Sequence, residues 1–431
     1  MTDLSEEIDH YLRRLFPLCR SITGHGNRET LRILQEIIPL SILEIPTGEK
    51  VYDWEIPREW NVREAWIKNS RGEKIVDFRN NNLHLVSYSQ PVHTRLGWND
   101  LKDHLHYRED LPHAIPYKTS YYRETWGFCI SWDDCRRLFP GDEEFEVFID
   151  SELTQGNLTL GEMLIPGKSR REYLISTYFC HPSLANDNLS GVVLTAFLAR
   201  ELMKTPRQFS YRVVFAPETI GAIAYCQTHE EAMKKILGGF VVTCVGGPGS
   251  VYFKKSFDPG HWINAVVEDV LRETGEEFLV YPFDHGSDER QYSSPAFRIN
   301  MVTVGKDKYF EYPGYHTSLD NLDLVKAGAI HQSLGIYLKV LDRLDLEIIF
   351  ENFNPACETM LSRHGLYPRN DEDLVFSKGK GLNEIHIILW LLFYCDGKTG
   401  LNEISRKMEV PVEALGRVAE KLEKAKVLGR V

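Results

Sequence analysis

Three short segments of the 431-residue chain place histidine and carboxylate side chains where predicted strands give way to helices. The first contains His181 and Asp187, the second Glu218 and the third His316. Neutral imidazole and carboxylate are nitrogen and oxygen ligands that zinc takes in proteins. A further carboxylate beside such an ion can accept the proton of the water that the ion activates. These residue types therefore suit metal-assisted hydrolysis.

Each segment taken alone also has a purely structural interpretation. A histidine bonded within its loop and an aspartate capping the next helix would account for His181 and Asp187. Glu218 would be favoured at a helix start by the helix dipole, and His316 would serve as a cap or core residue. The recurrence of such residues at several strand-to-helix junctions is what favours a common site.

The elements that must position these residues alternate between strands and helices from about residue 155 onward. We predict strands over 157–165, 172–179, 211–215, 239–244, 278–281 and 299–304, and helices over 190–203, 221–235, 262–273 and 324–341. This alternation indicates an α/β fold, a mostly parallel sheet with helices on both faces. Because ligands bind beyond the carboxyl ends of strands in such sheets, we expect the three segments to meet there.

Two further regions lack this alternation of strands and helices. Two helices are predicted within residues 5–40, followed by short β-prone runs at 64–67, 83–88, 126–130 and 145–149. Helices predicted over 382–394, 401–408 and 412–425 outline a winged-helix-like module. We therefore expect a catalytic domain from 1–48 and 150–350, an inserted β-rich domain at 49–149, and a linker with a winged-helix-like domain at 351–431.

Composition narrows the class of protein. The formal charge of -12 argues against nucleic acid as the main partner, because binding it requires a basic surface. No apolar run approaches the roughly 20 residues of a membrane span, and the acidic N-terminus does not resemble a secretory leader. The 8 cysteines lack CxxC spacing, which indicates reduced thiols. We expect a cytoplasmic protein without a membrane partner.

In their order and spacing these segments resemble the zinc aminopeptidase superfamily, which normally carries two co-catalytic metals. His181 falls on that superfamily's first histidine ligand, and Asp187, in Asn-Asp-Asn-Leu-Ser-Gly, falls on its metal-bridging aspartate. Glu218 matches its general base, and His316, in Tyr-His-Thr-Ser-Leu-Asp-Asn-Leu, matches its last histidine ligand. The resemblance implies the aminopeptidase fold and a metal-dependent amide hydrolysis.

The whole chain also resembles a bacterial family of aminopeptidase-like proteins with an inserted β domain and a C-terminal winged helix. The motifs that carry this likeness are Pro116–Tyr122 in the insert, Gly286–Gln291 and the helical tail. The likeness implies that the insert can close over the active end of the sheet, where Tyr121, Tyr122 and Arg123 are candidates for contact with substrate. The structural alternative is a Tyr-rich β-sheet surface and core. Tyr122 is the chosen candidate. The likeness also points to the Ser-Asp segment, whose Asp288, Glu289 and Arg290 are further candidates for binding substrate.

Two departures from the superfamily concern the metal ligands. Its Glu-Glu pair is Glu218-Thr219 here, and the strand that should end in a ligating aspartate ends in Thr243-Cys244. A neutral threonine is a poor replacement for an anionic ligand. We therefore expect a single zinc ion, held by His181, Asp187 and His316 with an open position for water. Cys244 is either a fourth ligand or, as we favour, a buried inert thiol.

Several functions remain compatible with these residues. A zinc-dependent hydrolase with Glu218 as general base would act on a small peptide or amide, or would deacylate a small modified amine or sugar. The alternative is a non-catalytic regulatory protein whose altered metal site only senses a ligand. Retention of Glu218 favours the enzyme, because a binding site needs no general base. We expect the tail to serve in self-association, giving a homo-oligomer, or in contact with a partner rather than in DNA binding, since Val412–Ala425 interleaves basic and acidic residues.

Overall fold

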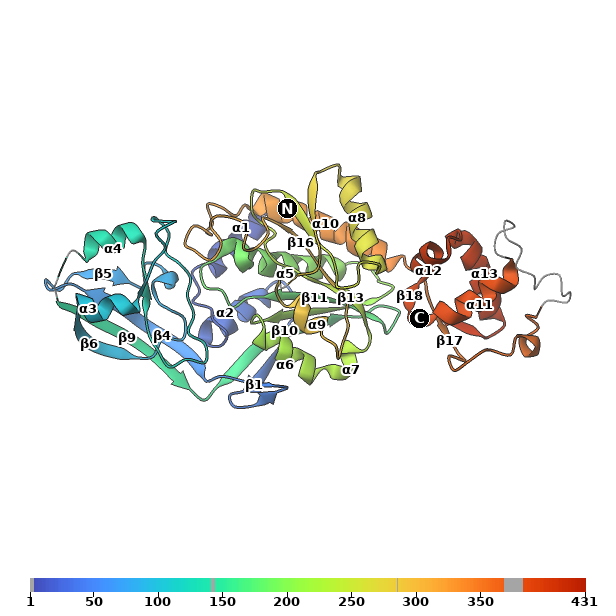
Figure 1. The fold of residues 1–431 in the computed structure, drawn as a ribbon, viewed down its shortest axis with the longest axis horizontal. Helices are drawn as coiled ribbons and strands as arrows, with labels where there is room; N and C mark the ends of the chain where they lie inside the picture. The colour runs from blue at the N-terminus through green and yellow to red at the C-terminus, as the bar shows by residue number, and fades with distance from the viewer. Residues whose placement is uncertain (1–3, 140, 142–143, 285, 368–382) are drawn as a thin grey trace.

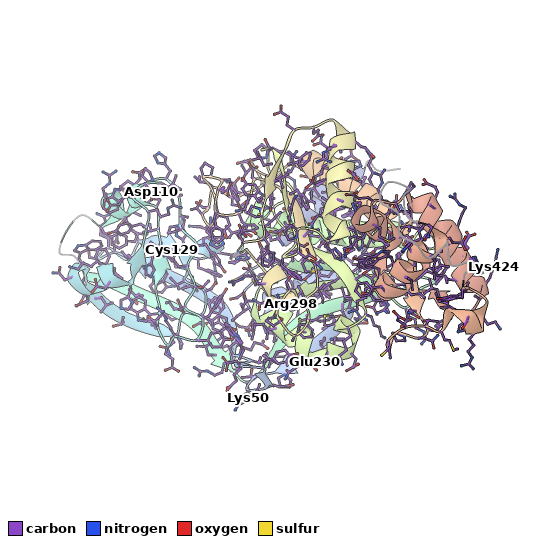
Figure 2. The ribbon with its side chains drawn as sticks, turned by 45° about the vertical axis from the view of Figure 1, so that its right-hand side comes forward. Lys50, Asp110, Cys129, Glu230, Arg298 and Lys424 are labelled. Atoms are coloured by element: carbon purple, nitrogen blue, oxygen red, sulfur yellow. The ribbon has the colours of Figure 1, made fainter. Side chains whose placement is uncertain are left out.

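The computed structural model describes residues 4–139, 141, 144–284, 286–367 and 383–431. Figure 1 shows three bodies in a row: a β-rich insert, a central α/β body and a C-terminal body. Figure 2, turned by 45°, keeps the insert, marked by Asp110 and Cys129, and the C-terminal body, marked by Lys424, at opposite ends. The central body therefore separates the other two.

A large mixed sheet forms the middle of the central body. Among the described residues it has eight strands in the order β1-β10-β12-β11-β13-β16-β14-β15. Their bounds are β1 (Ser41–Pro46), β10 (Asn157–Ile165), β12 (Ser210–Ala216), β11 (Glu172–Tyr178), β13 (Ile236–Val241), β16 (Met301–Lys306), β14 (Val251–Lys254) and β15 (Phe278–Tyr281). The four middle strands, β12, β11, β13 and β16, are parallel, and antiparallel pairs join them to the outer strands.

Helices cover both faces of this sheet, because successive side chains of each buried strand point to opposite sides. Along β12, Val213 and Phe215 join one apolar cluster, and Val214 joins a second cluster on the opposite face. The helices of the central body are α1 (Leu4–Leu15), α2 (His25–Leu34), α5 (Gly191–Leu202), α6 (Ile220–Thr228), α7 (Glu230–Met233), α8 (Trp262–Thr274), α9 (Glu289–Tyr292) and α10 (Ala327–Asp345). The expected fold class is confirmed.

The insert leaves and re-enters the central sheet at neighbouring positions. β1 and β10 are antiparallel partners, and Pro46 lies opposite Asn157. Within the insert an antiparallel sheet runs in the order β5-β4-β9-β6. The insert's elements are β2 (Lys50–Val51), β3 (Trp54–Glu55), β4 (Glu59–Lys68), β5 (Lys74–Asp77), β6 (Val92–Gly97), α3 (Trp98–Leu101), β7 (Leu105–His106), β8 (Phe128–Cys129), α4 (Trp132–Leu138) and β9 (Glu144–Thr154), with 3₁₀ turns at Asn82–His84 and Lys102–His104.

The C-terminal body has an apolar core of its own. It contains β17 (Ile349–Asn352), α11 (Glu384–Tyr394), β18 (Asp396–Gly400), α12 (Leu401–Met408), α13 (Val412–Lys424) and β19 (Leu428–Arg430), with a 3₁₀ turn at Leu361–His364. Its small sheet is ordered β18-β17-β19. In the described part of the chain, no helix has the length and apolar character that crossing a membrane requires.

Several elements differ from the expectations. The helix expected over 221–235 is two helices, α6 and α7, and the strand expected over 239–244 is β13, which ends at Val241. Residues 83–88 were predicted as a strand, yet Asn82–His84 is a 3₁₀ turn and Leu85 makes only an isolated bridge to Phe128. The strand β14 was not predicted at all. It is only four residues long and follows a glycine-rich segment at 246–249, which reads as a loop.

Candidate active site

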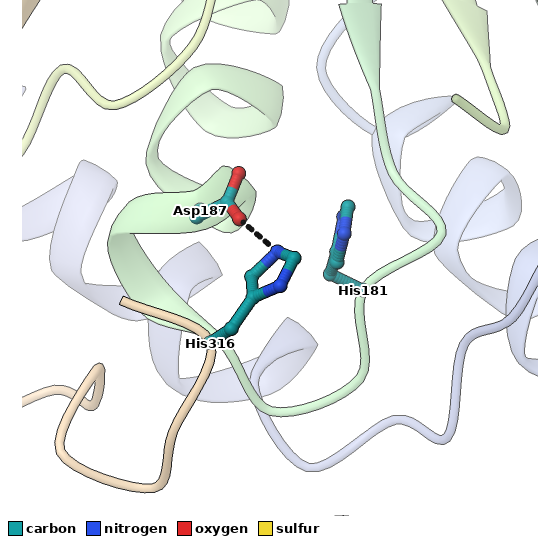
Figure 3. Close-up of side chains that lie close together, drawn as sticks. All are labelled: His181, Asp187 and His316. Atoms are coloured by element: carbon teal, nitrogen blue, oxygen red, sulfur yellow. Dashed lines mark ion pairs between the residues drawn. The ribbon is translucent and has the colours of Figure 1, made fainter. Parts of the chain in front are cut away.

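Two connections at the carboxyl edge of the parallel strands bring His181, Asp187 and His316 together. His181 follows β11, Asp187 lies on the segment between β11 and α5, and His316 lies on the connection from β16 to α10. Each offers one ligand atom, and these three atoms lie within 4.8 Å of one another. Figure 3 shows the three side chains turned toward a common point.

The two oxygens of Asp187 have different surroundings. Oδ2 lies 2.9 Å from Nε2 of His316. Apart from this contact with each other, neither of these buried atoms has a polar partner within the described residues. Oδ1 accepts a hydrogen bond of 2.5 Å from the Tyr178 hydroxyl. One buried carboxylate oxygen and one imidazole nitrogen are therefore free to bind a third group.

The protonation states of the ligand candidates suit a metal. Burial lowers the pKa of His181 to about 4, so that its imidazole is neutral at physiological pH. Burial opposes the charge of Asp187, but His181 and His316 outweigh it and the pKa of the carboxyl falls to about 2. Neutral imidazole and anionic carboxylate are the forms that bind a metal. The donor set therefore fits zinc.

Other polar side chains hold the loops that carry these residues. Asp320 accepts hydrogen bonds from the backbone N–H groups of Asn186 (2.6 Å) and Asp187 (2.9 Å). The buried guanidinium of Arg20 donates to the backbone carbonyl of His181 at 3.2 Å. The connection that carries His181 and Asp187 is thus held by two other parts of the chain.

Glu218 lies between β12 and α6, close to His181. Its Oε2 is 3.8 Å from Nε2 of His181, and its Oε1 accepts a hydrogen bond of 2.5 Å from the hydroxyl of Ser287. The side chain is 30% exposed, so it can reach a molecule in the adjoining cavity. Burial, followed by the charges of Asp288 and Asp187, raises the pKa of Glu218.

The Ser-Asp segment, Ser287–Arg290, bonds to the loop that carries Glu218 and does not line the cavity within the described residues. Asp288 accepts a hydrogen bond from the backbone N–H of Thr219 at 2.7 Å. Glu289 is fully buried, forms an ion pair with Lys254, and accepts a hydrogen bond from the backbone N–H of Ser287. In the described part of the chain, Asp288, Glu289 and Arg290 lie outside the cavity lining. Asp288 and Glu289 are buried among protein groups, and Arg290 is exposed. Contact of these three residues with substrate stays a prediction.

The two threonines that replace carboxylates have different positions. Thr219 lines the cavity beside Glu218. Thr243 is fully buried, and its hydroxyl lies 2.7 Å from that of Tyr178. Cys244 is also fully buried, and burial raises the pKa of its thiol well above the usual range. This environment favours the inert thiol over a fourth ligand.

A cavity of about 370 Å³ opens next to the candidate metal centre. Its lining includes His181, Glu218 and His316, together with Ile22, Trp54, Tyr117, Thr119, Tyr121, Tyr122, Cys180, Thr219 and Ile220. The insert supplies the aromatic walls. The backbone of the insert also bonds to the loop that carries His316, because the Tyr117 N–H donates to the carbonyl of His316 at 2.8 Å. Tyr122, a candidate for substrate contact, lies on this wall.

Four further residues contribute to the site without a sequence pattern that assigns them a role: Tyr178, Asp320, Tyr117 and Trp54. Tyr178 belongs to a strand in which every residue is buried, so its sequence position indicates only a core residue. Asp320 lies within the His316 motif, four residues after the histidine, and only the structure shows that it is buried and accepts hydrogen bonds from backbone N–H groups. Tyr117 and Trp54 are far from the ligand motifs in sequence, and only the folded insert brings them to the cavity.

The fold and the site together define an aminopeptidase-like protein. A zinc aminopeptidase from Bacillus subtilis has the same fold, with 14% identity, a TM-score of 0.59, and coverage of 79% of this chain and 94% of that chain. The chain itself belongs to the family described as a domain of unknown function, DUF4910, which matches residues 9–347. A winged helix-turn-helix family matches residues 348–430, which places β17 in that module.

A Clostridium acetobutylicum relative is similar along nearly the whole chain. It is 40% identical over 425 residues, covering 98% of this chain and 96% of its own length, and is provisionally named a polysaccharide biosynthesis protein with an aminopeptidase-like domain. A crystal structure from the same organism, provisionally described as a peptidase, has 40% identity and a TM-score of 0.79. It covers 99% of this chain and 96% of that chain. The three-body arrangement is thus similar to one seen in a crystal.

Proposed function

We propose that this protein is a zinc-dependent hydrolase of amides or short peptides, with one ion held by His181, Asp187 and His316. The observation that carries the proposal is the convergence of these three ligand atoms within 4.8 Å, beside a cavity that Glu218 also lines. The aminopeptidase-like fold supports it, because that fold belongs to peptidase-like hydrolases. The free thiols of all eight cysteines, which lie within the described residues, support a cytoplasmic location.

Different groups of the site have different roles in the proposed hydrolysis. Zinc, when bound, supplies Lewis acidity, which polarises an amide carbonyl and lowers the pKa of water. Glu218 accepts the proton of the attacking water and delivers it to the leaving nitrogen. Ser287 fixes the orientation of Glu218 by donating to Oε1. A raised pKa suits this carboxyl, because it must hold the proton between the two transfers.

The cavity favours a small substrate. A volume of about 370 Å³ lies at the lower end of the range for small-molecule sites and leaves no room for a folded protein. Its walls carry the rings of Trp54, Tyr117, Tyr121 and Tyr122, and its lining contains no lysine or arginine among the described residues. We infer that Tyr122 contacts an apolar or ring-bearing part of the substrate. An amino-acid amide or a short peptide fits these properties.

A second candidate is the deacylation of a small amine or amino sugar. Aromatic walls suit the apolar faces of sugar rings as well as side chains. The provisional name of the Clostridium acetobutylicum relative refers to polysaccharide biosynthesis. The same residues would carry out both reactions, so substrate screening with the zinc-loaded protein must include N-acylated amino sugars alongside amino-acid amides and dipeptides.

The test of the proposed mechanism is the variant Glu218→Gln. The amide is nearly isosteric, so we expect an unchanged fold and unchanged zinc content. Turnover of any substrate found in the screen should fall by about a hundred- to ten-thousand-fold in kcat, the usual contribution of a general base. Glu413→Gln, in the C-terminal body, is the matched control and should be fully active.

Two results would contradict this assignment. Hydrolysis by Glu218→Gln at the wild-type rate would show that the base is another group. Loss of zinc from Glu218→Gln would show that Glu218 is a ligand. A zinc-loaded protein that hydrolyses none of the screened amides would favour the alternative of a regulatory protein.

A further inference from the structure

The hydroxyl of Tyr178 occupies one oxygen of Asp187, the residue that matches a metal-bridging aspartate. The bond to Oδ1 is 2.5 Å long, within the range of hydrogen bonds between a hydroxyl and a charged carboxylate. Tyr178 and Asp187 are both buried, so water does not compete for this bond. A carboxylate that bridges two cations uses both of its oxygens. Here one oxygen already has a proton donor.

Thr243 supports this arrangement from the neighbouring strand end. Its hydroxyl is 2.7 Å from the Tyr178 hydroxyl. A carboxylate can only accept, so the single hydroxyl proton of Tyr178 goes to Asp187, and Thr243 donates to the Tyr178 oxygen. A row of three groups therefore runs from Thr243 through Tyr178 to Asp187. It holds Asp187 in place without any additional positive ion.

The charge around the site agrees with one ion rather than two. The three clustered ligand residues supply one carboxylate, Asp187. Asp320 is close, but its oxygens are taken by backbone N–H groups and by the hydroxyl of Tyr312. With Thr219 and Thr243 neutral, a second divalent cation would lack the two anionic ligands that the superfamily supplies at these positions. The hydrogen bond from Tyr178 to Asp187 and the loss of two carboxylates thus each favour one metal ion per chain.

We propose that the Tyr178 hydroxyl, held by Thr243, takes the place of a second metal ion on Asp187 and keeps the centre mononuclear. This inference rests on the proposed function, because it requires zinc at His181, Asp187 and His316. Tyr178 is a positioning residue: it acts on the ion through Asp187. Restoring carboxylates at positions 219 and 243 is then insufficient for a second ion while Tyr178 still donates to Asp187.

The experiment measures zinc content after dialysis, and zinc affinity by competition with a chromophoric chelator. The wild type should bind one zinc ion per chain. The double variant T219E/T243D should still bind one ion, and T219E/T243D/Y178F should bind two. Y178F alone should bind one ion with about 10- to 100-fold weaker affinity, the usual loss when the partner of a ligating group is removed.

Tyr173→Phe is the matched control. It lies on the same strand and is fully buried, but among the described residues its hydroxyl has no hydrogen-bond partner. Its zinc content and affinity should equal those of the wild type. Circular dichroism before each titration confirms that the variants are folded.

Each other outcome decides against the inference. Two ions in T219E/T243D would mean that Tyr178 does not block the second position, and one ion in the folded triple variant would mean that another group does. If the triple variant does not fold, wild-type affinity in Y178F overturns the inference. Uptake of one zinc ion by the wild type leaves the proposed function intact in all these cases, whereas uptake of none would overturn both.

Discussion

At the scale of single residues, the candidate ligands depend on polar partners that fix their loops. Asn188 donates to the backbone carbonyls of Tyr178 and Val242, and so joins the ends of two parallel strands beneath Asp187. Asp320 holds the backbone of Asp187 itself. Partners of this kind orient metal ligands and are costly to remove. The loop conformation, and not only the ligand types, thus determines whether a metal binds.

Removal of a histidine ligand is expected to abolish metal binding. His316→Ala and His181→Ala each leave two of three ligands, and zinc held by two protein ligands does not survive dialysis. Metal analysis should fall from about one equivalent per chain to a trace. His10→Ala, an exposed histidine on α1, is the control and should retain its zinc. Retention of a full equivalent by both site variants would place the metal elsewhere.

The ligand candidates were predictable from the sequence because each combines a suitable residue type with a strand-to-helix junction. Tyr178 was not, because nothing in a buried strand distinguishes a tyrosine that bonds a ligand from one that only packs. Tyr173 and Tyr178 lie on the same strand, and both are buried. The two tyrosines differ only in the folded protein, where the hydroxyl of Tyr178 contacts Asp187 and Thr243.

At the scale of elements, two parts of the insert shape the cavity. The hairpin β2–β3 carries Trp54, and the hydroxyl of Tyr52 at its turn donates to Glu230 of α7 at 2.6 Å. The segment after Tyr117 carries Tyr122, whose hydroxyl donates to the carbonyl of Glu55 at 3.2 Å. The rings of Trp54 and Tyr122 are 6.0 Å apart in an edge-to-face arrangement. The insert thus places two aromatic rings at fixed positions on the wall.

Truncation of an exposed wall residue is expected to weaken substrate binding. Tyr122 is 53% exposed although it lines the cavity. Tyr122→Ala should raise KM about tenfold and change kcat little, because a ring contact contributes on the order of 1 kcal/mol to the ground state and the transition state alike. Tyr367→Ala, equally exposed at 53% in the C-terminal body, should leave both constants unchanged. An unaltered KM in Tyr122→Ala would exclude this wall from substrate binding.

The strands that sequence patterns located best are those with strong flanking signals. β10 and β15 have the predicted bounds, because turn residues surround a clear β-prone run. Residues 83–88 also form a β-prone run but lie in the insert close to the central body, where Asn82 donates to the backbone carbonyl of Pro17. There Ser87 N–H donates to the carbonyl of Lys118 and not to a regular neighbouring strand. Tertiary contacts override strand propensity at such positions.

At the scale of the whole molecule, the C-terminal body lies at the end opposite the insert and therefore away from the catalytic cavity (Figure 1). The basic side chains of its helix α13 and the following strand are partly neutralised. Lys421 pairs with Glu384, and Arg430 pairs with Glu423 at 3.2 Å. The first helix, α11, leaves Trp390 and Phe393 exposed, the latter by 72%. This surface suits a protein partner better than a nucleic acid.

We expect the C-terminal body to join two copies of the chain through α11. The double variant Trp390→Ser and Phe393→Ser should lower the mass of the particle in light scattering, because the exposed rings would supply most of the buried apolar area. Leu346→Ser, an exposed apolar change outside α11, is the control. A wild type that is monomeric at all concentrations would contradict this expectation, as would tight, salt-sensitive binding of duplex DNA.

The insert and the central sheet share one apolar cluster, and this has a kinetic consequence. Trp60 and Phe145 of the insert belong to the same cluster as Leu160 and Val214 of the sheet. Separation of the two bodies would expose apolar side chains of this shared cluster, at about 1.5–3 kcal/mol for each side chain that becomes fully exposed. A small substrate releases too little free energy on binding to offset this. The walls of the cavity are accordingly in place before the substrate arrives. Encounter should thus be a single diffusional step, without the slow closing phase that gated enzymes show in stopped-flow traces.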